Sequence, residues 1–329
     1  MKHILNTLIE YQSLSKADAK GILTRLARGE FNNSQMAAFL TVYLMRSITV
    51  DELEGFRDAM LELCVPLRID AHDAIDLCGT GGDGKDTFNI STTASFIVAG
   101  AGQKVAKHGN NGVSSVCGSS NLLAHFGYSF TNNEAQLKRS LNEAGICFLH
   151  APLFHPAMKN VAPVRRELGM KTFFNMLGPM VNPSFPKKQL VGVFSLELAR
   201  LYAYLYQQTD MQFVIVHSLD GYDEISLTGP FKMITNRGEE LLHPEDLGLS
   251  THAPEALSGG SSVEDAAYIF MEVLSGRGTL AQQEAAVANA GVALYCAQAA
   301  PTPRAGVALA QSALASGKAM EAFQKLINR

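Results

Sequence analysis

Hydrophobic and polar positions divide the chain into two regions with different periodicities. Residues 1–66 carry apolar residues at helical spacing, interrupted by turn and capping residues. The clearest start signal is Thr49-Val50-Asp51-Glu52, a capping box that predicts a helix running to about Cys64. Two further helices are predicted in this region, at Lys16–Arg28 and Gln35–Leu44.

Beyond residue 66, short apolar runs of strand length alternate with helical stretches. This alternation predicts βα units and a sheet flanked by helices. Ala-rich segments after Ser261, Thr279 and Thr302 predict that the C-terminal part is mainly helical. The predicted strands are Ala74–Leu77, Lys104–Ala106, Ile146–His150, Leu190–Phe194 and Phe213–His217.

The two patterns predict an α/β protein with two domains. Residues 1–66 would form a small helical domain, and residues 67–329 a larger α/β domain around a central, mostly parallel sheet. A helical segment near residues 156–180 would pack back on the first domain. The larger domain is the one expected to bind ligand and carry catalysis.

Composition narrows the class of protein. Of the 329 residues, 47% are hydrophobic and 18% charged, which predicts a folded chain with a sizeable core. The net charge of −4 argues against a general nucleic-acid binder. The five scattered cysteines lack C-x-x-C spacing and indicate free thiols in a reducing cytoplasm. We expect no signal peptide and no membrane span.

The most informative segment is GTGGDGKDTFNIST at residues 79–92. Its glycines allow close approach of backbone N–H groups to an anion and tolerate positive φ. A helix starting at Asn89–Thr92 would direct its free N–H groups at the same anion. Together with Lys107-His108-Gly109-Asn110, this turn predicts a site for a ligand with several phosphate groups.

Two familiar nucleotide motifs fit this turn less well. Gly79, Gly81 and Gly84 match G-x-G-x-x-G, but no acid follows about 20 residues on, as dinucleotide binding requires. A P-loop would need Ser or Thr where Asp86 stands. A glycine turn with no ligand is a third reading, which the polar residues packed into the turn disfavour.

Asp223 and Glu224 follow a predicted strand by a few residues. Neighbouring carboxylates beside a polyphosphate suggest Mg²⁺. Their spacing alone favours a solvated acidic turn over a metal site. Lys107 and His108 on their own would suit an ordinary surface, although Asn110 and several serines nearby add the donors of a phosphate cradle.

An ordered set of motifs resembles the anthranilate phosphoribosyltransferase family over nearly the whole chain. Its members are GTGGDG, NIST, KHGN, Ser114-Ser115, Val164–Gly169 (VRRELG), Phe174–Pro179 (FNMLGP) and Gly221–Ile225 (GYDEI). The resemblance implies transfer of the phosphoribosyl group of 5-phosphoribosyl 1-pyrophosphate to the amino group of anthranilate. This reaction belongs to tryptophan biosynthesis.

The resemblance also implies the site residues. Ser91, Asp223 and Glu224 would bind Mg²⁺, and the anthranilate contacts would be Gly79, Asn110, Arg165, His155 and Pro179. From the residues alone, Arg165 could be a solubilising helix residue, and His155 and Pro179 could be loop packing. The phosphoribosyl pyrophosphate contacts would be Gly79, Gly82, Asp83, Thr87, Asn89, Ile90, Ser91, Thr92, Lys107, His108, Gly109, Asn110, Asn111, Gly112, Val113, Ser114, Ser115 and Ser119.

The chain departs from the family pattern at four positions. Asn111 and Val116 stand where many members have Arg and Lys, Asn121 where an Asp is common, and Lys171 where the family has Arg. The phosphate site has therefore fewer cationic side chains than is usual in the family.

No nucleophile or general base is implied, because the amine of anthranilate is neutral near pH 7. Two rival functions stay open: a pyrimidine nucleoside phosphorylase of the same architecture, usually a longer chain, and a non-catalytic nucleic-acid-binding relative. The resemblance implies a homodimer with no membrane or nucleic-acid partner. We also expect the helices near 35–46 and 52–63 to expose apolar residues to a second copy, namely Phe39, Leu40, Tyr43, Leu44, Phe56 and Met60.

Overall fold

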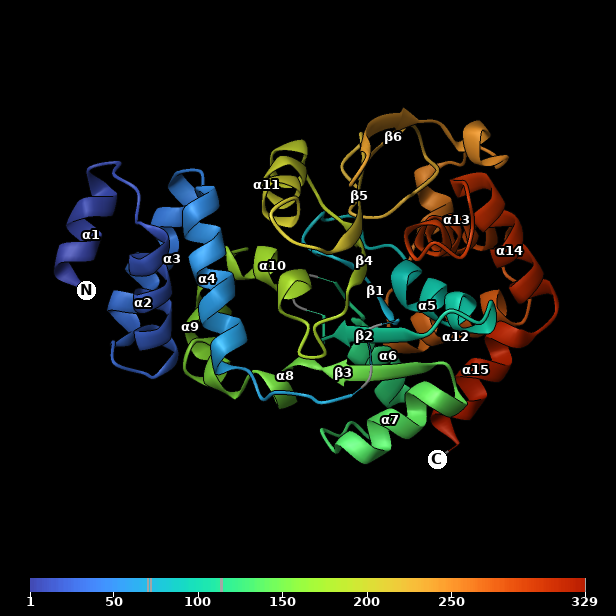
Figure 1. Cartoon of the computed structure of the whole chain (residues 1–329), viewed down its shortest axis with the longest axis horizontal. Helices are drawn as coiled ribbons and strands as arrows, with labels where there is room; N and C mark the ends of the chain where they lie inside the picture. The colour runs from blue at the N-terminus through green and yellow to red at the C-terminus, as the bar shows by residue number, and fades with distance from the viewer. Residues whose placement is uncertain (70, 72, 113–114, 329) are drawn as a thin grey trace. The chain divides into compact units, whose positions relative to one another are not determined.

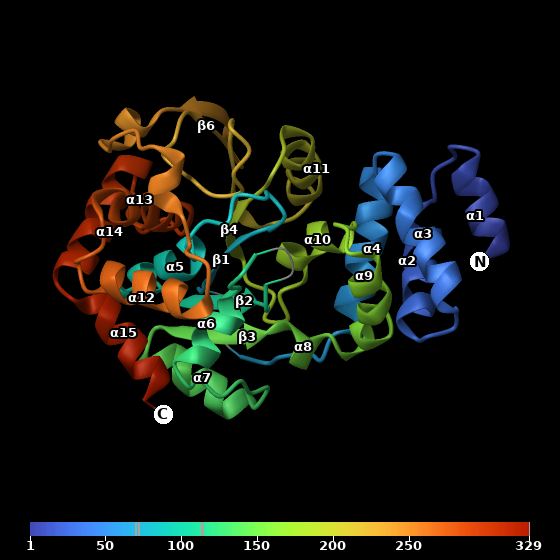
Figure 2. The ribbon, with the colours of Figure 1, turned by 180° about the vertical axis from the view of Figure 1, so that it is seen from behind.

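The computed structural model describes residues 1–69, 71, 73–112 and 115–328, and its chain forms two compact units. Unit 1 consists of Met1–Pro66 and Ala151–Pro183, and unit 2 of Leu67–His150 and Ser184–Arg329. Figures 1 and 2 show the course of the chain from opposite sides. Among the described residues, no helix is both long and apolar enough to cross a membrane.

Unit 1 is entirely helical. The capping signals acted as the sequence predicts: Thr49 and Glu52 form the capping box of α4, and Ser15 caps α2. The α-helices are α1 (Lys2–Ile9), α2 (Lys16–Ala27), α3 (Asn33–Met45), α4 (Val50–Leu63), α8 (Ala151–Phe154), α9 (Ala162–Leu168) and α10 (Phe174–Leu177), and two 3₁₀ helices are η1 (Pro156–Asn160) and η2 (Gly178–Val181).

An aromatic cluster forms the core of unit 1 and corrects one expectation. The residues expected to be left apolar for a second copy are mostly buried within the unit, since Phe39 and Phe56 are fully covered and Met60 is 5% exposed. The returning segment 151–183 supplies the cover: Phe173 stacks on Phe56 at 4.4 Å between ring centroids and meets Phe39 edge-on at 6.0 Å. The prediction of an unburied face was wrong because it left this segment out.

Unit 2 is built on a seven-stranded sheet with strand order β3-β2-β1-β4-β5-β6-β7. The first five strands in this order run parallel, and β6 and β7 extend the sheet as an antiparallel edge. The predicted fold class is thereby confirmed. The strands are β1 (Ile75–Gly79), β2 (Val105–Gly109), β3 (Ile146–His150), β4 (Lys188–Gly192), β5 (Gln212–Ser218), β6 (Phe231–Thr235) and β7 (Gly238–Leu242).

The strand order has a switch point between β1 and β4. From β1 the chain moves outward to β2 and β3, whereas from β4 it moves the other way to β5. Right-handed crossovers then place α5 and α11 on opposite faces of the sheet, as Figures 1 and 2 show. Open α/β sheets bind ligands at the carboxyl ends of the strands flanking such a point.

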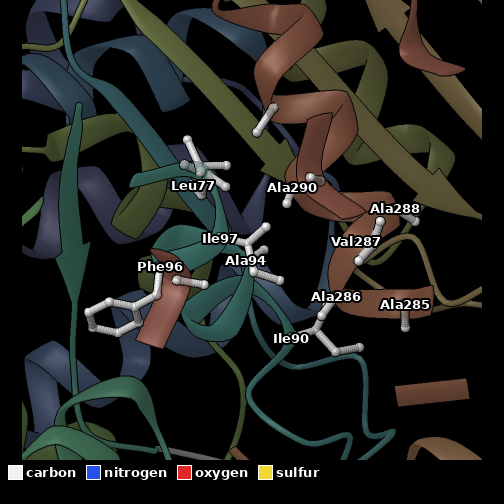
Figure 3. Close-up of a cluster of buried hydrophobic side chains, with 14 of the residues drawn as sticks. Leu77, Ile90, Ala94, Phe96, Ile97, Ala285, Ala286, Val287, Ala288 and Ala290 are labelled. Carbon is white, nitrogen blue, oxygen red and sulfur yellow. The ribbon is translucent and has the colours of Figure 1, made fainter. Parts of the chain in front are cut away.

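Helices cover both faces of the sheet. Figure 3 shows Ile90, Ala94 and Ile97 of α5 meeting the alanine-rich face of α13, where small side chains allow the two helices to approach closely. The helices of unit 2 are α5 (Ile90–Gly100), α6 (Ser119–His125), α7 (Glu134–Glu143), α11 (Leu196–Tyr206), α12 (Val263–Leu274), α13 (Leu280–Cys296), α14 (Pro303–Ala315) and α15 (Lys318–Ile327), with 3₁₀ helices η3 (Pro244–Leu247) and η4 (Pro254–Leu257).

Candidate active site

The glycine turn leaves the carboxyl end of β1 and leads into α5. Gly81, Gly82 and Gly84 have φ values of 69°, 80° and 73°, a region that side chains disfavour, so the turn requires glycine at these positions. Asp83 lies between them and accepts a hydrogen bond from the Lys85 N–H at 3.1 Å. The turn therefore keeps a polar loop compact at the end of the strand next to the switch point.

The start of α5 lacks a side-chain cap. Asn89 occupies the N-cap position but donates its side-chain amide to the Cys117 carbonyl oxygen at 2.9 Å instead of capping the helix. The first-turn N–H groups of an α-helix have no partner within the helix, and they attract anions. The predicted contacts Asn89, Ile90, Ser91 and Thr92 all belong to this helix start.

Asp223 and Glu224 lie in the loop between β5 and β6, and this loop crosses the ends of β1 and β4. Asp223 accepts a hydrogen bond from the Gly81 N–H at 2.5 Å. A Cβ atom at Gly79 or at Gly192, the last residues of β1 and β4, would overlap Asp223. Glycine at both strand ends thus admits the acidic segment at the switch point.

A buried asparagine of α13 also holds the loop that carries Asp223 and Glu224. Asn289 of α13 accepts a hydrogen bond from the Ile225 N–H at 3.1 Å and donates one to the Ile225 carbonyl oxygen at 2.9 Å. This side chain is 1% exposed. Nothing in the sequence pattern singled it out, because a lone Asn in an Ala-rich helix has no motif around it.

The carboxylates of this cluster are held close together. Burial, together with the nearby Glu224 and Asp83, raises the pKa of Asp223 well above its usual range. Burial raises the pKa of Glu224 to about 7, although Lys107 and the hydroxyl and N–H of Ser91 favour its charged form. Such a site has an excess of negative charge that a cation would relieve.

The donor set suits Mg²⁺ held jointly with a ligand. Carboxylate and hydroxyl oxygens are the donors that this ion prefers, and it commonly takes one or two carboxylates and completes its shell with water and phosphate oxygens. In the described part of the chain, no three His, Cys, Asp or Glu side chains converge into a full protein cage. Asp223, Glu224 and Ser91 therefore offer a partial shell that substrate oxygens would complete.

Lys107 is a strand residue and not part of a loop. Strand β2 extends three residues beyond its predicted end, so Lys107 lies inside the sheet and is 2% exposed. Its ammonium donates to the Leu77 carbonyl oxygen at 2.5 Å and to the Ser91 hydroxyl at 3.4 Å. Burial lowers its pKa, while neighbouring Cys78, Asp76 and Glu224 act against that shift. The alternative interpretation of Lys107 as an ordinary surface residue is therefore wrong.

Asp76 of β1 is a buried acid that the sequence analysis missed. It is fully covered and accepts hydrogen bonds from the His108 N–H and from the Gln189 side-chain amide, both at 3.2 Å. Asp76 lies within an apolar run of the sequence, and a charged residue in such a run was the only signal that it has a special role. Asp76 thus connects β1 to its neighbours β2 and β4 beneath the glycine turn.

The loop after β2 is closed by its own hydrogen bonds. The Asn110 carbonyl oxygen accepts bonds from the Ser120 N–H at 3.0 Å and the Ser119 hydroxyl at 3.4 Å. Asn121 accepts bonds from the N–H groups of Gly112 and Gly118 at 2.8 and 3.1 Å. The predicted contacts Asn110, Asn111 and Ser115 are exposed, Gly109 ends the strand, and Val113 and Ser114 lie outside the described residues.

Backbone hydrogen bonds from residues 257–259 also hold the glycine turn, and the sequence analysis did not predict them. The Gly259 N–H donates to the Asp86 carbonyl oxygen, and the Phe88 N–H to the Leu257 carbonyl oxygen, each at 2.9 Å. Thr87 pairs with Ser258 in an isolated antiparallel bridge. Ser258-Gly259-Gly260 was the available signal, since glycine at 259 permits this close backbone approach.

The remaining predicted residues belong to unit 1. Arg165 of α9 is half-buried, with its guanidinium 5.1 Å from the Phe174 ring centroid and 3.4 Å from the Asn175 side-chain oxygen. Burial lowers the pKa of this guanidinium, whereas Arg166 is exposed. His155 and Pro179 are both buried, and the His155 ring bonds the Val181 carbonyl oxygen at 2.9 Å.

Comparison with known proteins places this geometry in a family. Residues 71–320 match the family described as "Glycosyl transferase family, a/b domain". Residues 2–64 match the family described as "Glycosyl transferase family, helical bundle domain". The chain is 58% identical to an anthranilate phosphoribosyltransferase of Flavobacterium psychrophilum over 99% of its own length and 98% of that relative. The chain belongs to the anthranilate phosphoribosyltransferase family.

Solved structures of anthranilate phosphoribosyltransferases share the fold. The one from Thermus thermophilus superposes with a TM-score of 0.91 at 34% identity and covers 98% of each chain. The one from Saccharomyces cerevisiae, in complex with PRPP and Mg, has a TM-score of 0.90 at 26% identity and covers 98% of this chain and 96% of that one. The resemblance of the ordered motifs is therefore confirmed at the level of the family.

The glycine at the end of β4 gives a test of how the acidic loop is seated. Gly192→Ala would push a Cβ atom into the Asp223 backbone, so we expect the free energy of unfolding to fall by about 1–3 kcal/mol. Gly229→Ala, where the added atom meets nothing within 4 Å, should stay within about 0.5 kcal/mol of the wild type. Urea unfolding of both variants measures these changes in the free energy of unfolding. Equal losses in the two variants would contradict the close packing of the Asp223 backbone on Gly192.

The raised pKa of Glu224 predicts a pH trend in stability. Between the ordinary value of 4.5 and about 7, the folded protein keeps a proton that the unfolded chain has lost. Stability of the wild type relative to Glu224→Gln should therefore fall as pH rises through this window, by an amount on the order of 2–3 kcal/mol.

Urea unfolding at pH 5 and pH 8 without Mg²⁺ measures this difference. Glu240→Gln, an exposed position on β7, is the matched control and should show no such trend. A difference between the wild type and Glu224→Gln that stays constant with pH would show that Glu224 is ionised freely in the folded protein.

Proposed function

We propose that this protein transfers the phosphoribosyl group of 5-phosphoribosyl 1-pyrophosphate to the amino group of anthranilate, with Mg²⁺ as cofactor. The products would be N-(5-phosphoribosyl)anthranilate and pyrophosphate, as in tryptophan biosynthesis. Family membership supports this activity, and so do the PRPP and Mg bound by the yeast relative. The observation that carries it in this chain is the acidic segment seated by Gly81 beside the uncapped start of α5.

The residues of unit 2 would bind and orient the phosphates. The glycine turn and the start of α5 offer N–H donors, and Lys107 supplies a fixed positive charge behind Ser91. Asp223, Glu224 and Ser91 would hold Mg²⁺, which supplies charge neutralisation of the pyrophosphate group. The predicted contacts from residues 79–92 and 107–119 carry over to this proposal unchanged.

The reaction needs orientation more than acid–base groups. The lone pair of the anthranilate nitrogen forms a bond to C1 of the ribose as the bond from C1 to the pyrophosphate oxygen breaks, and its electron pair leaves with pyrophosphate. The nitrogen then loses one proton to solvent. Donors that are already in place when charge develops on the leaving oxygen lower the barrier, because they need no reorganisation.

Direct assay separates this function from its rivals. With 5-phosphoribosyl 1-pyrophosphate and Mg²⁺ present, the purified chain should consume anthranilate, followed by loss of its fluorescence, and removal of Mg²⁺ with a chelator should stop the reaction. Phosphorolysis of uridine or thymidine in place of anthranilate consumption would favour a nucleoside phosphorylase. Absence of both activities, with binding to nucleic acid, would favour a non-catalytic relative.

Arg165 is proposed to bind the carboxylate of anthranilate. A planar guanidinium can make paired, charge-assisted hydrogen bonds to this group. Arg165→Ala should therefore cost about 2–4 kcal/mol of anthranilate binding. The KM for anthranilate should rise steeply, while the KM for 5-phosphoribosyl 1-pyrophosphate stays within a few fold.

The matched control is Arg166→Ala, an exposed neighbour on the same helix that should change neither KM. Steady-state kinetics with each substrate varied in turn would decide the assignment. A large anthranilate effect at Arg166 and none at Arg165 would assign the carboxylate to the other arginine. His155, Pro179, Gly79 and Asn110 are proposed as further anthranilate contacts.

We also propose a cytoplasmic homodimer whose helical domain spans residues 1–66 and whose catalytic domain spans residues 67–329. The resemblance to the family supports the dimer, whereas the expected unburied aromatic face does not, because those side chains are covered within unit 1. A monomeric mass in light scattering at all concentrations would overturn the dimer. Recovery of the native protein outside the cytoplasmic fraction would overturn the location.

A further inference from the structure

The segments around the site carry few cationic side chains. Residues 79–92, 107–121, 219–228 and 257–262 contain only two lysines, Lys85 and Lys107, and no arginine. Lys107 is buried and its ammonium is already bonded to the Leu77 carbonyl oxygen and the Ser91 hydroxyl. It can face a bound phosphate from behind the turn, but its burial and these bonds hold it in place. Lys85 is the other lysine and it is exposed.

The backbone around Lys85 is pinned on both sides. Its own N–H donates to Asp83 at 3.1 Å, and the carbonyl oxygen of the next residue, Asp86, accepts the Gly259 N–H at 2.9 Å. The side chain is held less firmly, because among the described residues its ammonium forms no ion pair. A flexible stem on a fixed backbone lets the ammonium swing while its origin stays in place.

The Lys85 ammonium rests above the acidic segment. It lies 4.6 Å from the centroid of the Tyr222 ring, and Tyr222 immediately precedes Asp223. Tyr222 is 3% exposed, so the ring is a fixed platform. An exposed cation over the face of an aromatic ring is held weakly and can exchange the ring for a phosphate oxygen, which bonds an ammonium more strongly.

We propose that Lys85 recognises the pyrophosphate group of the substrate, moving to it from its resting place on Tyr222. This inference rests on the proposed function, since it assigns a residue to that substrate. The pyrophosphate and not the 5-phosphate is the target, because Tyr222, on which the ammonium rests, directly precedes Asp223, and the phosphates that share Mg²⁺ with Asp223 would lie nearest to it. Lys85 thereby supplies the movable charge that Asn111 and Val116 do not.

Calorimetric titration of the full chain with inorganic pyrophosphate and Mg²⁺ tests the proposal without the transfer reaction. Lys85→Met should weaken binding about tenfold, as expected for loss of one charge-assisted bond at an open site. Lys85→Arg should restore most of the affinity. Lys138→Met, at an exposed position on α7, is the matched control and should bind as the wild type does.

Ribose 5-phosphate serves as a second probe in the same experiment. Its affinity should be equal in the wild type and in Lys85→Met. Unchanged pyrophosphate affinity in Lys85→Met, or a loss confined to ribose 5-phosphate, would overturn the proposal. A wild type that binds pyrophosphate with Mg²⁺ but transfers nothing to anthranilate would refute the proposed function and leave the Lys85 assignment standing.

Discussion

The hydrogen bond from the Gly81 N–H to the Asp223 carboxylate organises the switch point of unit 2. It joins residues 142 positions apart in sequence, and it brings the acidic loop onto the ends of β1 and β4. The bond can form only because glycine ends both strands, which leaves space for the acid. This long-range contact holds the carboxylates at the strand ends, where Glu224 meets Ser91 and where Tyr222 meets the Lys85 ammonium.

Local signals in the sequence predicted the elements around this contact well. Thr49, Thr279 and Thr302 cap the helices that follow them through their side chains, and such signals act over a few positions and can be read without the fold. The predicted strands lie where expected, with shifts of up to three residues at their ends. The edge strands β6 and β7 were not predicted. The exposed strand β7, Gly238–Leu242, has little apolar pattern, whereas β6, Phe231–Thr235, has one and was overlooked.

Contacts between distant segments were less accessible to sequence reasoning. The predicted strand ended at Ala106 and left Lys107 open to an ordinary surface position, although register with β3 keeps it inside the sheet. The aromatic face of unit 1 was read as unburied because the segment that carries Phe173 lies more than a hundred residues further along the chain. Asp76 and Asn289 were passed over for the same reason, since each is explained only by partners that the fold supplies.

The two hydrogen bonds between Asn289 and the backbone of Ile225 have a consequence for synthesis of the chain. The acidic loop emerges from the ribosome well before α13, and its backbone at Ile225 then lacks the amide that fixes it. A nascent chain that ends short of residue 289 contains strands β1 to β7 but lacks the Asn289 side chain that holds Ile225. The full set of contacts on the acidic loop therefore becomes available only once α13, in the last fifth of the polypeptide, has been made.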